Sequence, residues 1–156
     1  MLEPGAVVLG FDYGSRRIGV AVGQRITGTA TALTVLGNGS NGPDWAAIDK
    51  LLREWRPAQL LVGLPLTISG EEQPASRAAR AFGRALHERF GLPVDEHDER
   101  YSSRAAEHAF SQARSRGEAR RKDAALLDAQ AARLIVERYL AQLPRHDSTT
   151  TRDQET

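Results

Sequence analysis

Acidic side chains at three separate points of the chain have the chemistry of a divalent metal site. They are Asp12, the neighbouring pair Asp98 and Glu99, and Asp128. Mg²⁺ and Mn²⁺ prefer hard oxygen ligands and keep several waters, so two or three carboxylates without histidine or cysteine suit them. Two such ions about 4 Å apart can activate a water and stabilise the leaving oxygen in phosphodiester hydrolysis. Metal-dependent hydrolysis is therefore indicated if folding brings these acids together, whereas each acid alone could be an ordinary surface or capping carboxylate.

Asp12 follows the first of two apolar runs near the N-terminus. The runs 6–11 and 18–22 flank a turn at 13–17, which predicts a β-hairpin with Asp12 at the end of its first strand. A charge at the end of a buried strand costs several kcal/mol unless something compensates it. A metal ion or a bound hydroxyl would do so. The structural alternative is that Asp12 pairs with Arg16 or Arg17, or caps its own turn through backbone N–H groups.

The rest of the pattern predicts an α/β domain with a five-stranded mixed sheet flanked by helices. Three antiparallel strands are expected first, and two parallel strands, each reached through a helix, are expected after them. Asp44 is expected to cap the first helix and Pro57 to follow its end. The expected strands are 6–11, 18–22, 29–36, 58–64 and 93–97, and the expected helices are 45–55, 75–90, 102–114 and 124–143.

This order predicts where the acids meet. The strands 6–11, 58–64 and 93–97 are expected to end at one edge of the sheet, which is where open α/β folds place their ligands. Asp12 and the pair Asp98 and Glu99 come at that edge. Asp128 is expected on or beside the apolar stripe of the last helix that faces the sheet, a stripe formed by Leu127, Ala131, Leu134 and Ile135.

Length and composition indicate one domain over residues 1–143 and a disordered polar tail over 144–156. Cysteine is absent, no apolar run is long enough to span a membrane, and the N-terminus has no signal-peptide pattern, so a cytoplasmic protein is expected. The net charge of +1 does not by itself indicate a polyanionic partner.

A basic segment at 114–122 does indicate a polyanionic partner, although the net charge of the whole chain does not. It carries five cations against the single acid Glu118 and precedes the helix that bears Asp128. The alternative is a solvated charged loop. The residues predicted to contact nucleic acid are Arg16, Arg17, Arg100, Arg114, Arg116, Arg120, Arg121 and Lys122.

Five motifs, in order, resemble those of the YqgF/RuvX family over about residues 7–140. They are FDYGSRRIGVAVG, QRITGTA, VGLPLTISGEEQP, HDERYSS and DAQAARLIVERYL. The resemblance implies an RNase H-like fold, and the family is described as Holliday-junction-resolvase-like and as a nuclease that matures the 5′ end of pre-16S ribosomal RNA. It implies that Asp12, Glu99 and Asp128 are the catalytic acids that bind Mg²⁺ or Mn²⁺, with Asp98 as a neighbour. Thr67, Ser102 and Ser103 differ from the residues that are frequent at these positions in the family, but the acidic residues are all present.

The function predicted is a metal-dependent nuclease acting on structured nucleic acid, with pre-16S rRNA maturation favoured. The alternatives are a resolvase of branched DNA in recombination and repair, a non-catalytic RNA- or ribosome-binding factor, and an actin-like nucleotide-binding fold, which would need a second lobe. Expected partners are pre-rRNA or branched DNA and ribosomal particles, and the protein is expected to be a monomer or a homodimer.

Some other residues have a functional and a structural interpretation. The loop at 63–70 could approach a phosphate through backbone amides, although glycine and proline are ordinary there. His97 could assist proton transfer, but a packed or hydrogen-bonded histidine is favoured. Trp45 and Trp55 have helical core spacing and are predicted to pack in the core rather than stack on bases.

Overall fold

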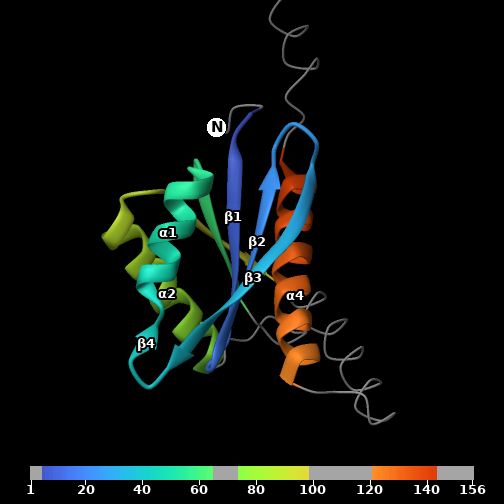
Figure 1. Cartoon of the computed structure of the whole chain (residues 1–156). Coiled ribbons are helices and arrows are strands. Elements are labelled where there is room, and N and C mark those ends of the chain that lie inside the picture. The colour runs from blue at the N-terminus through green and yellow to red at the C-terminus, as the bar shows by residue number, and fades with distance from the viewer. Residues whose placement is uncertain (1–4, 65–73, 99–120, 144–156) are drawn as a thin grey trace, which may run out of the picture.

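The structure, a computed structural model, describes residues 5–64, 74–98 and 121–143 (Figure 1). The strands are β1 (Val7–Tyr13), β2 (Arg17–Gln24), β3 (Thr29–Gly39), β4 (Gly42–Pro43), β5 (Gln59–Leu64) and β6 (Val94–Asp98). The helices are α1 (Trp45–Trp55), α2 (Pro74–Phe90) and α4 (Arg121–Gln142). The predicted helix at 102–114 and the predicted tail at 144–156 lie outside the described residues.

The strands form one mixed sheet in the order β4-β3-β2-β1-β5-β6. β1, β2 and β3 are antiparallel neighbours, whereas β5 is parallel to β1 and β6 is parallel to β5. The carboxyl ends of β1, β5 and β6 therefore lie at the same edge, as predicted. Among the described residues the sheet has six strands rather than the five predicted, because β3 extends to Gly39 and pairs with the two-residue β4 after a tight turn at residues 40–41; Gly42, which follows the turn, has a φ of 84°.

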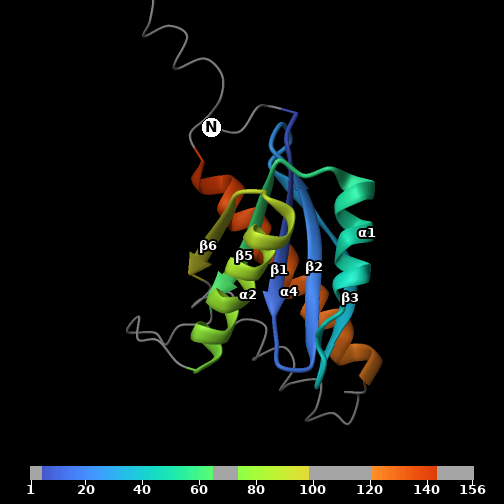
Figure 2. The same ribbon diagram turned by 90° about the vertical axis from the view of Figure 1, so that its left-hand side faces the viewer.

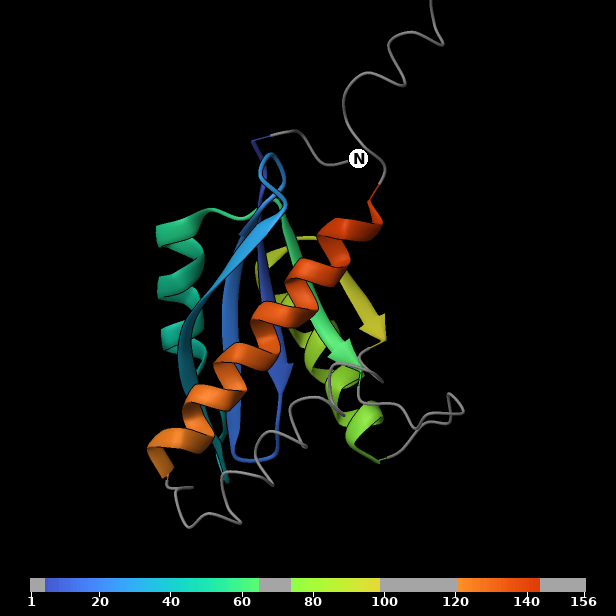
Figure 3. The same ribbon diagram turned by 90° about the vertical axis from the view of Figure 1, so that its right-hand side faces the viewer.

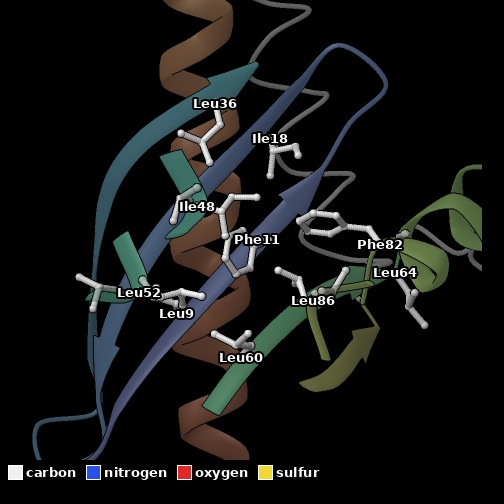
Figure 4. Close-up of a cluster of buried hydrophobic side chains, with 14 residues drawn as sticks. Leu9, Phe11, Ile18, Leu36, Ile48, Leu52, Leu60, Leu64, Phe82 and Leu86 are labelled. Atoms are coloured by element: carbon white, nitrogen blue, oxygen red, sulfur yellow. The ribbon is translucent and has the colours of Figure 1, made fainter. Parts of the chain in front are cut away.

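Helices α1 and α2 cover one face of this sheet (Figure 2). The Asp44 side chain accepts a hydrogen bond from the Ala47 N–H and caps α1, as predicted, and the helix ends at Arg56, before Pro57. Buried side chains of both helices pack on β1, β2 and β5 in one apolar cluster (Figure 4). The Phe82 ring forms a T-shaped pair with Phe11 and a stacked pair with Trp45. Both tryptophans pack against this cluster, in agreement with the packing interpretation.

Of the described helices, α4 covers the other face, where it crosses β1, β2 and β3 (Figure 3). Its buried residues Ala132, Ile135, Val136 and Leu140 pack on Val8, Ala21 and Leu61. Glycines let the helix approach closely: an added Cβ at Gly10 or Gly23 would collide with the Val136 side chain, and one at Gly19 would collide with the main chain of Asp128. The helix begins at Arg121, three residues before the predicted start.

Among the described residues, no helix is both long and apolar enough to cross a membrane.

Candidate active site

Asp12 and Asp128 come together on the face of the sheet that α4 covers. Side chains alternate along a strand, so Val8, Gly10 and Asp12 of β1 share one face, and Val8 and Gly10 contact α4. Asp12 pairs in register with Gly19 of β2. The main-chain carbonyl of Asp128 lies directly over Gly19. Asp12 and the main chain of Asp128 thus both adjoin Gly19 at the carboxyl end of β1.

Asp128 reaches this place because the sheet-facing side of α4 differs from the one predicted. Ile135 and Ala131 are buried as expected, but Leu127 and Leu134 are only partly buried, and Ile135 packs on the sheet together with Ala132, Val136 and Leu140. These lie four, eight and twelve residues after Asp128 and so form one face of the helix with it. The aspartate therefore belongs to the sheet-facing row itself.

Arg17 forms an ion pair with Asp128. Its Nε–H donates to Asp128 Oδ2 at 2.7 Å, and the two side chains are 39% and 31% exposed. The structural alternative considered from sequence paired Arg16 or Arg17 with Asp12. Arg17 pairs with Asp128, an acid 111 residues away in the sequence.

Asn38 fixes the turn between β1 and β2, and sequence reasoning missed it. Its side chain is 4% exposed and donates from Nδ2 to the Gly14 carbonyl at 2.6 Å, while its backbone N–H donates to the Arg16 carbonyl. A third bond, from the Gly14 N–H to the Arg17 carbonyl, closes the turn. The signal in the sequence was an asparagine between two glycines, which is also what an ordinary loop contains.

The third strand at this edge, β6, presents Asp95 and His97 on the α4 face. Asp95 pairs in register with Leu61 and His97 with Gly63, and Leu61 packs under α4. The Tyr139 hydroxyl donates to Asp95 Oδ2 at 2.7 Å, and burial, reinforced by this bond, raises the pKa of Tyr139. His97 is buried, and its ring meets Tyr139 edge-on. This environment agrees with the packed interpretation of His97.

Several predicted site residues lie outside the described part of the chain. These are Glu99, Arg100, Arg114, Arg116 and Arg120. Arg121 and Lys122 form the first turn of α4 instead of the connection that was predicted. Within the described residues no three acidic or histidine side chains gather around one point. The carboxylate pair of Asp12 and Asp128 fits Mg²⁺ or Mn²⁺ in its donor chemistry.

A groove of about 690 Å³ lies elsewhere, between the second half of α2 and the start of β6. Arg84, His87 and Asp95 are among the residues that line it. It opens away from the edge where β1, β5 and β6 end, so we do not place the chemistry there.

Solved structures of resolvases share this architecture. T. thermophilus RuvC in complex with a Holliday junction substrate matches with a TM-score of 0.52 at 17% identity, covering 86% of this chain and 93% of that one. The yeast mitochondrial Holliday junction resolvase Ydc2 matches with a TM-score of 0.51 at 13% identity, covering 100% and 87%. The class defined by the sheet order is therefore the RNase H-like fold of these enzymes.

Sequence comparison narrows this class to one family. The family model described as "RuvX: Holliday junction resolvase" matches residues 6–142, and the chain belongs to that family. A relative from Xanthomonas campestris pv. campestris (strain B100) is 53% identical over 140 residues, 90% of each chain, and a relative from Xanthomonas axonopodis pv. citri (strain 306) is 51% identical over the same shares. Both carry the name "Putative pre-16S rRNA nuclease". The chain is thus a nuclease, a hydrolase of phosphodiester bonds.

Proposed function

We propose that this chain is a metal-dependent nuclease that matures the 5′ end of pre-16S rRNA, acting on pre-ribosomal particles in the cytoplasm. The observation that carries the proposal is the meeting of Asp12 and Asp128 across Gly19 on one face of the sheet. Two carboxylates at the carboxyl edge of parallel strands suit metal-assisted phosphoryl chemistry. The names of the Xanthomonas relatives support pre-16S rRNA as the substrate.

In this proposal Asp12, Asp128 and Glu99 hold Mg²⁺ or Mn²⁺. Glu99 is preferred to Asp98 because it matches the acid of the family motif, whereas Asp98 pairs in register with Leu64, which packs on the face opposite α4. When bound, the ions would supply an activated water and stabilise the leaving oxygen. The protein's own part is to hold the carboxylates and to orient the substrate.

Positive charge near this edge would bind the substrate backbone. Arg16 is exposed in the turn that follows Asp12. Arg121 lies seven residues before Asp128 on α4, about 10 Å along the helix axis. With Arg17, Arg100 and the rest of the basic segment at 114–122, these cations would contact phosphates, which position a nucleic acid without reading its sequence.

A second candidate is the cleavage of branched DNA. It is favoured by the family description and by a fold shared with a resolvase bound to a Holliday junction. A four-way junction has two-fold symmetry, so this activity would need a homodimer, whereas trimming an RNA end needs a single active site.

The test offers purified protein, with Mn²⁺ or Mg²⁺, a pre-16S rRNA fragment and a synthetic four-way junction in parallel, and follows products on denaturing gels. We expect cleavage of the RNA at the 5′ end of the mature sequence, and none in EDTA. Preferential, symmetric cleavage of the junction, together with a dimer by light scattering, would support the second candidate. Binding of RNA without cleavage of either substrate would instead identify a non-catalytic RNA-binding factor.

A further inference from the structure

We infer that Arg17 balances the charge of the acidic site in the absence of metal, and that it thereby weakens the affinity of the site for divalent cations. The inference rests on the proposed function, because it assigns Asp12 and Asp128 to a metal site. It concerns a residue that the sequence predicted to contact nucleic acid or to pair with Asp12.

The geometry gives Arg17 a fixed place beside the carboxylates. It lies on the α4 face of β2, two residues before Gly19, and its main chain is held by pairing with Gly37 of β3 and by the hydrogen bond from the Gly14 N–H. Its Nε–H contacts only one oxygen of Asp128, Oδ2, at 2.7 Å. The pair is partly exposed, so small ions and water can reach it.

The physical reason is electrostatic. Asp12 and Asp128 meet across a residue that has no side chain, and without a cation their like charges repel. The guanidinium of Arg17 offsets part of this repulsion. The same positive charge repels an entering divalent ion. Arg17 therefore stabilises the metal-free protein and weakens metal binding.

The direction in which metal affinity changes when Arg17 is removed distinguishes charge balance from a purely structural role. If Arg17 served only to orient the Asp128 carboxylate, its removal would leave the ligand less ordered and weaken metal binding. If it balances charge, its removal strengthens metal binding. An elementary charge about 6 Å from a divalent ion in a water-like dielectric corresponds to roughly a tenfold change in affinity.

The experiment measures Mn²⁺ binding to the full chain by isothermal titration calorimetry, without substrate. We expect Arg17→Met to bind Mn²⁺ roughly tenfold more tightly than the unmodified protein. Arg17→Lys keeps the charge and should stay within about twofold. Arg16→Met removes the same charge from the neighbouring exposed position, where solvent screening keeps its effect to about twofold. Arg17→Gln, which is polar but uncharged, repeats the test should the methionine variant fold poorly.

Thermal unfolding gives an independent measurement. In EDTA, Arg17→Met should melt about 1–3 °C lower than the unmodified protein, because the part of the repulsion that Arg17 offsets is restored. Saturating Mn²⁺ should raise its melting temperature by more than it raises that of the unmodified protein, since a ligand that binds only the folded state stabilises in proportion to its affinity.

The outcomes separate this inference from the proposed function. If the unmodified protein does not bind Mn²⁺, or if Asp12→Asn leaves the binding unchanged, the metal site itself is refuted. If Asp12→Asn abolishes binding but Arg17→Met binds Mn²⁺ equally well or more weakly, the metal site stands and the role of Arg17 is refuted. Equal strengthening in Arg17→Met and Arg16→Met would also refute it, because the effect would then be one of overall charge.

Discussion

At the scale of single residues, a substitution at Asp12 can test cleavage separately from folding, because Asp12 is only partly buried near the end of β1. Asp12→Asn keeps the size of the side chain and removes its charge. We expect cleavage to be abolished, while the melting temperature in EDTA stays the same or rises slightly because repulsion from Asp128 is relieved. Gel-based cleavage and thermal unfolding measure the two effects.

The matched control is Asp49→Asn on α1, which breaks only an exposed i,i+4 pair with Arg53. It should cleave at the normal rate. Normal cleavage by Asp12→Asn as well would show that the site is assigned to the wrong residue.

The neighbouring acids Asp98 and Glu99 allow a second comparison at this scale. Because Asp98 pairs in register with Leu64, which packs on the face opposite α4, Glu99→Ala should reduce cleavage to background, and Asp98→Ala should retain most of it. Mn²⁺ titration of both variants checks whether the loss follows metal binding. An inactive Asp98→Ala beside an active Glu99→Ala would reverse the assignment.

At the scale of elements, the contact between α4 and β2 depends on Gly19. An alanine there would place a methyl group into the main chain of Asp128, so α4 would have to move away from the sheet. We expect Gly19→Ala to lower the free energy of unfolding by about 1–3 kcal/mol and to reduce cleavage as well. Urea denaturation measures the first effect and gel assays the second.

Gly37→Ala in β3 is the control, since no atom lies within 4 Å of an added Cβ at that position. Its effect on stability should stay within about 0.5 kcal/mol. Equal destabilisation by both variants would mean that the close approach of α4 is not what requires glycine at 19.

The Tyr139 hydroxyl connects α4 to β6 and gives the fold a dependence on alkaline pH. Burial, together with the hydrogen bond to Asp95, raises the pKa of Tyr139 above its ordinary value. The unfolded chain therefore loses this proton at about pH 10 while the folded chain keeps it, so the stabilisation is complete below that pH and decreases above it. Urea denaturation at a series of pH values from 8 to 11 should show a steeper decline for the unmodified protein than for Tyr139→Phe.

Below pH 10 the phenylalanine variant should be less stable by about 0.5–1.5 kcal/mol, the usual net contribution of one hydrogen bond. Tyr13→Phe serves as the comparison, since Tyr13 packs near Phe82 on the other face of the sheet. The same alkaline slope in all three proteins would show that the Tyr139 contact does not contribute.

The sequence predicted the order and type of the elements well, because each depends on local patterns. The Asp44 cap, Pro57 after α1 and the apolar runs of β1, β2 and β5 are visible in any short window. What it could not predict depends on contacts between distant residues. The ion pair of Arg17 with Asp128 joins residues 111 positions apart, and the hydrogen bond from Asn38 to the Gly14 carbonyl joins residues 24 positions apart. The sheet-facing side of α4 was also misjudged, since glycines of β1 and β2, rather than helical periodicity, decide which residues can approach.

At the scale of the whole molecule, a balanced net charge of +1 conceals an uneven distribution. The basic segment at 114–122 runs into the helix that carries Asp128. Replacing Arg120, Arg121 and Lys122 together by alanine should weaken binding to RNAs of unrelated sequence and reduce the salt slope by roughly one unit per lost phosphate contact. Fluorescence anisotropy over a range of salt concentrations measures both quantities.

Turnover at saturating substrate should fall much less in this triple variant than in Asp12→Asn, because the acids remain. Unchanged affinity and an unchanged salt slope would mean that the segment is a solvated charged loop and that the substrate approaches the acids by another path.

The glycine contact under α4 also bears on how this sequence can diverge. Because main-chain atoms meet at Gly19, the height of Asp128 above the sheet is independent of which apolar side chains fill the remaining contact. Ala132 can therefore exchange volume with Val8, Ala21 and Leu61, which pack in the same cluster, while the contact at Gly19 is kept. Substitutions should therefore be tolerated among the apolar side chains between α4 and the sheet, and they should not be tolerated at Gly19, although Gly19 has no side chain that could take part in catalysis.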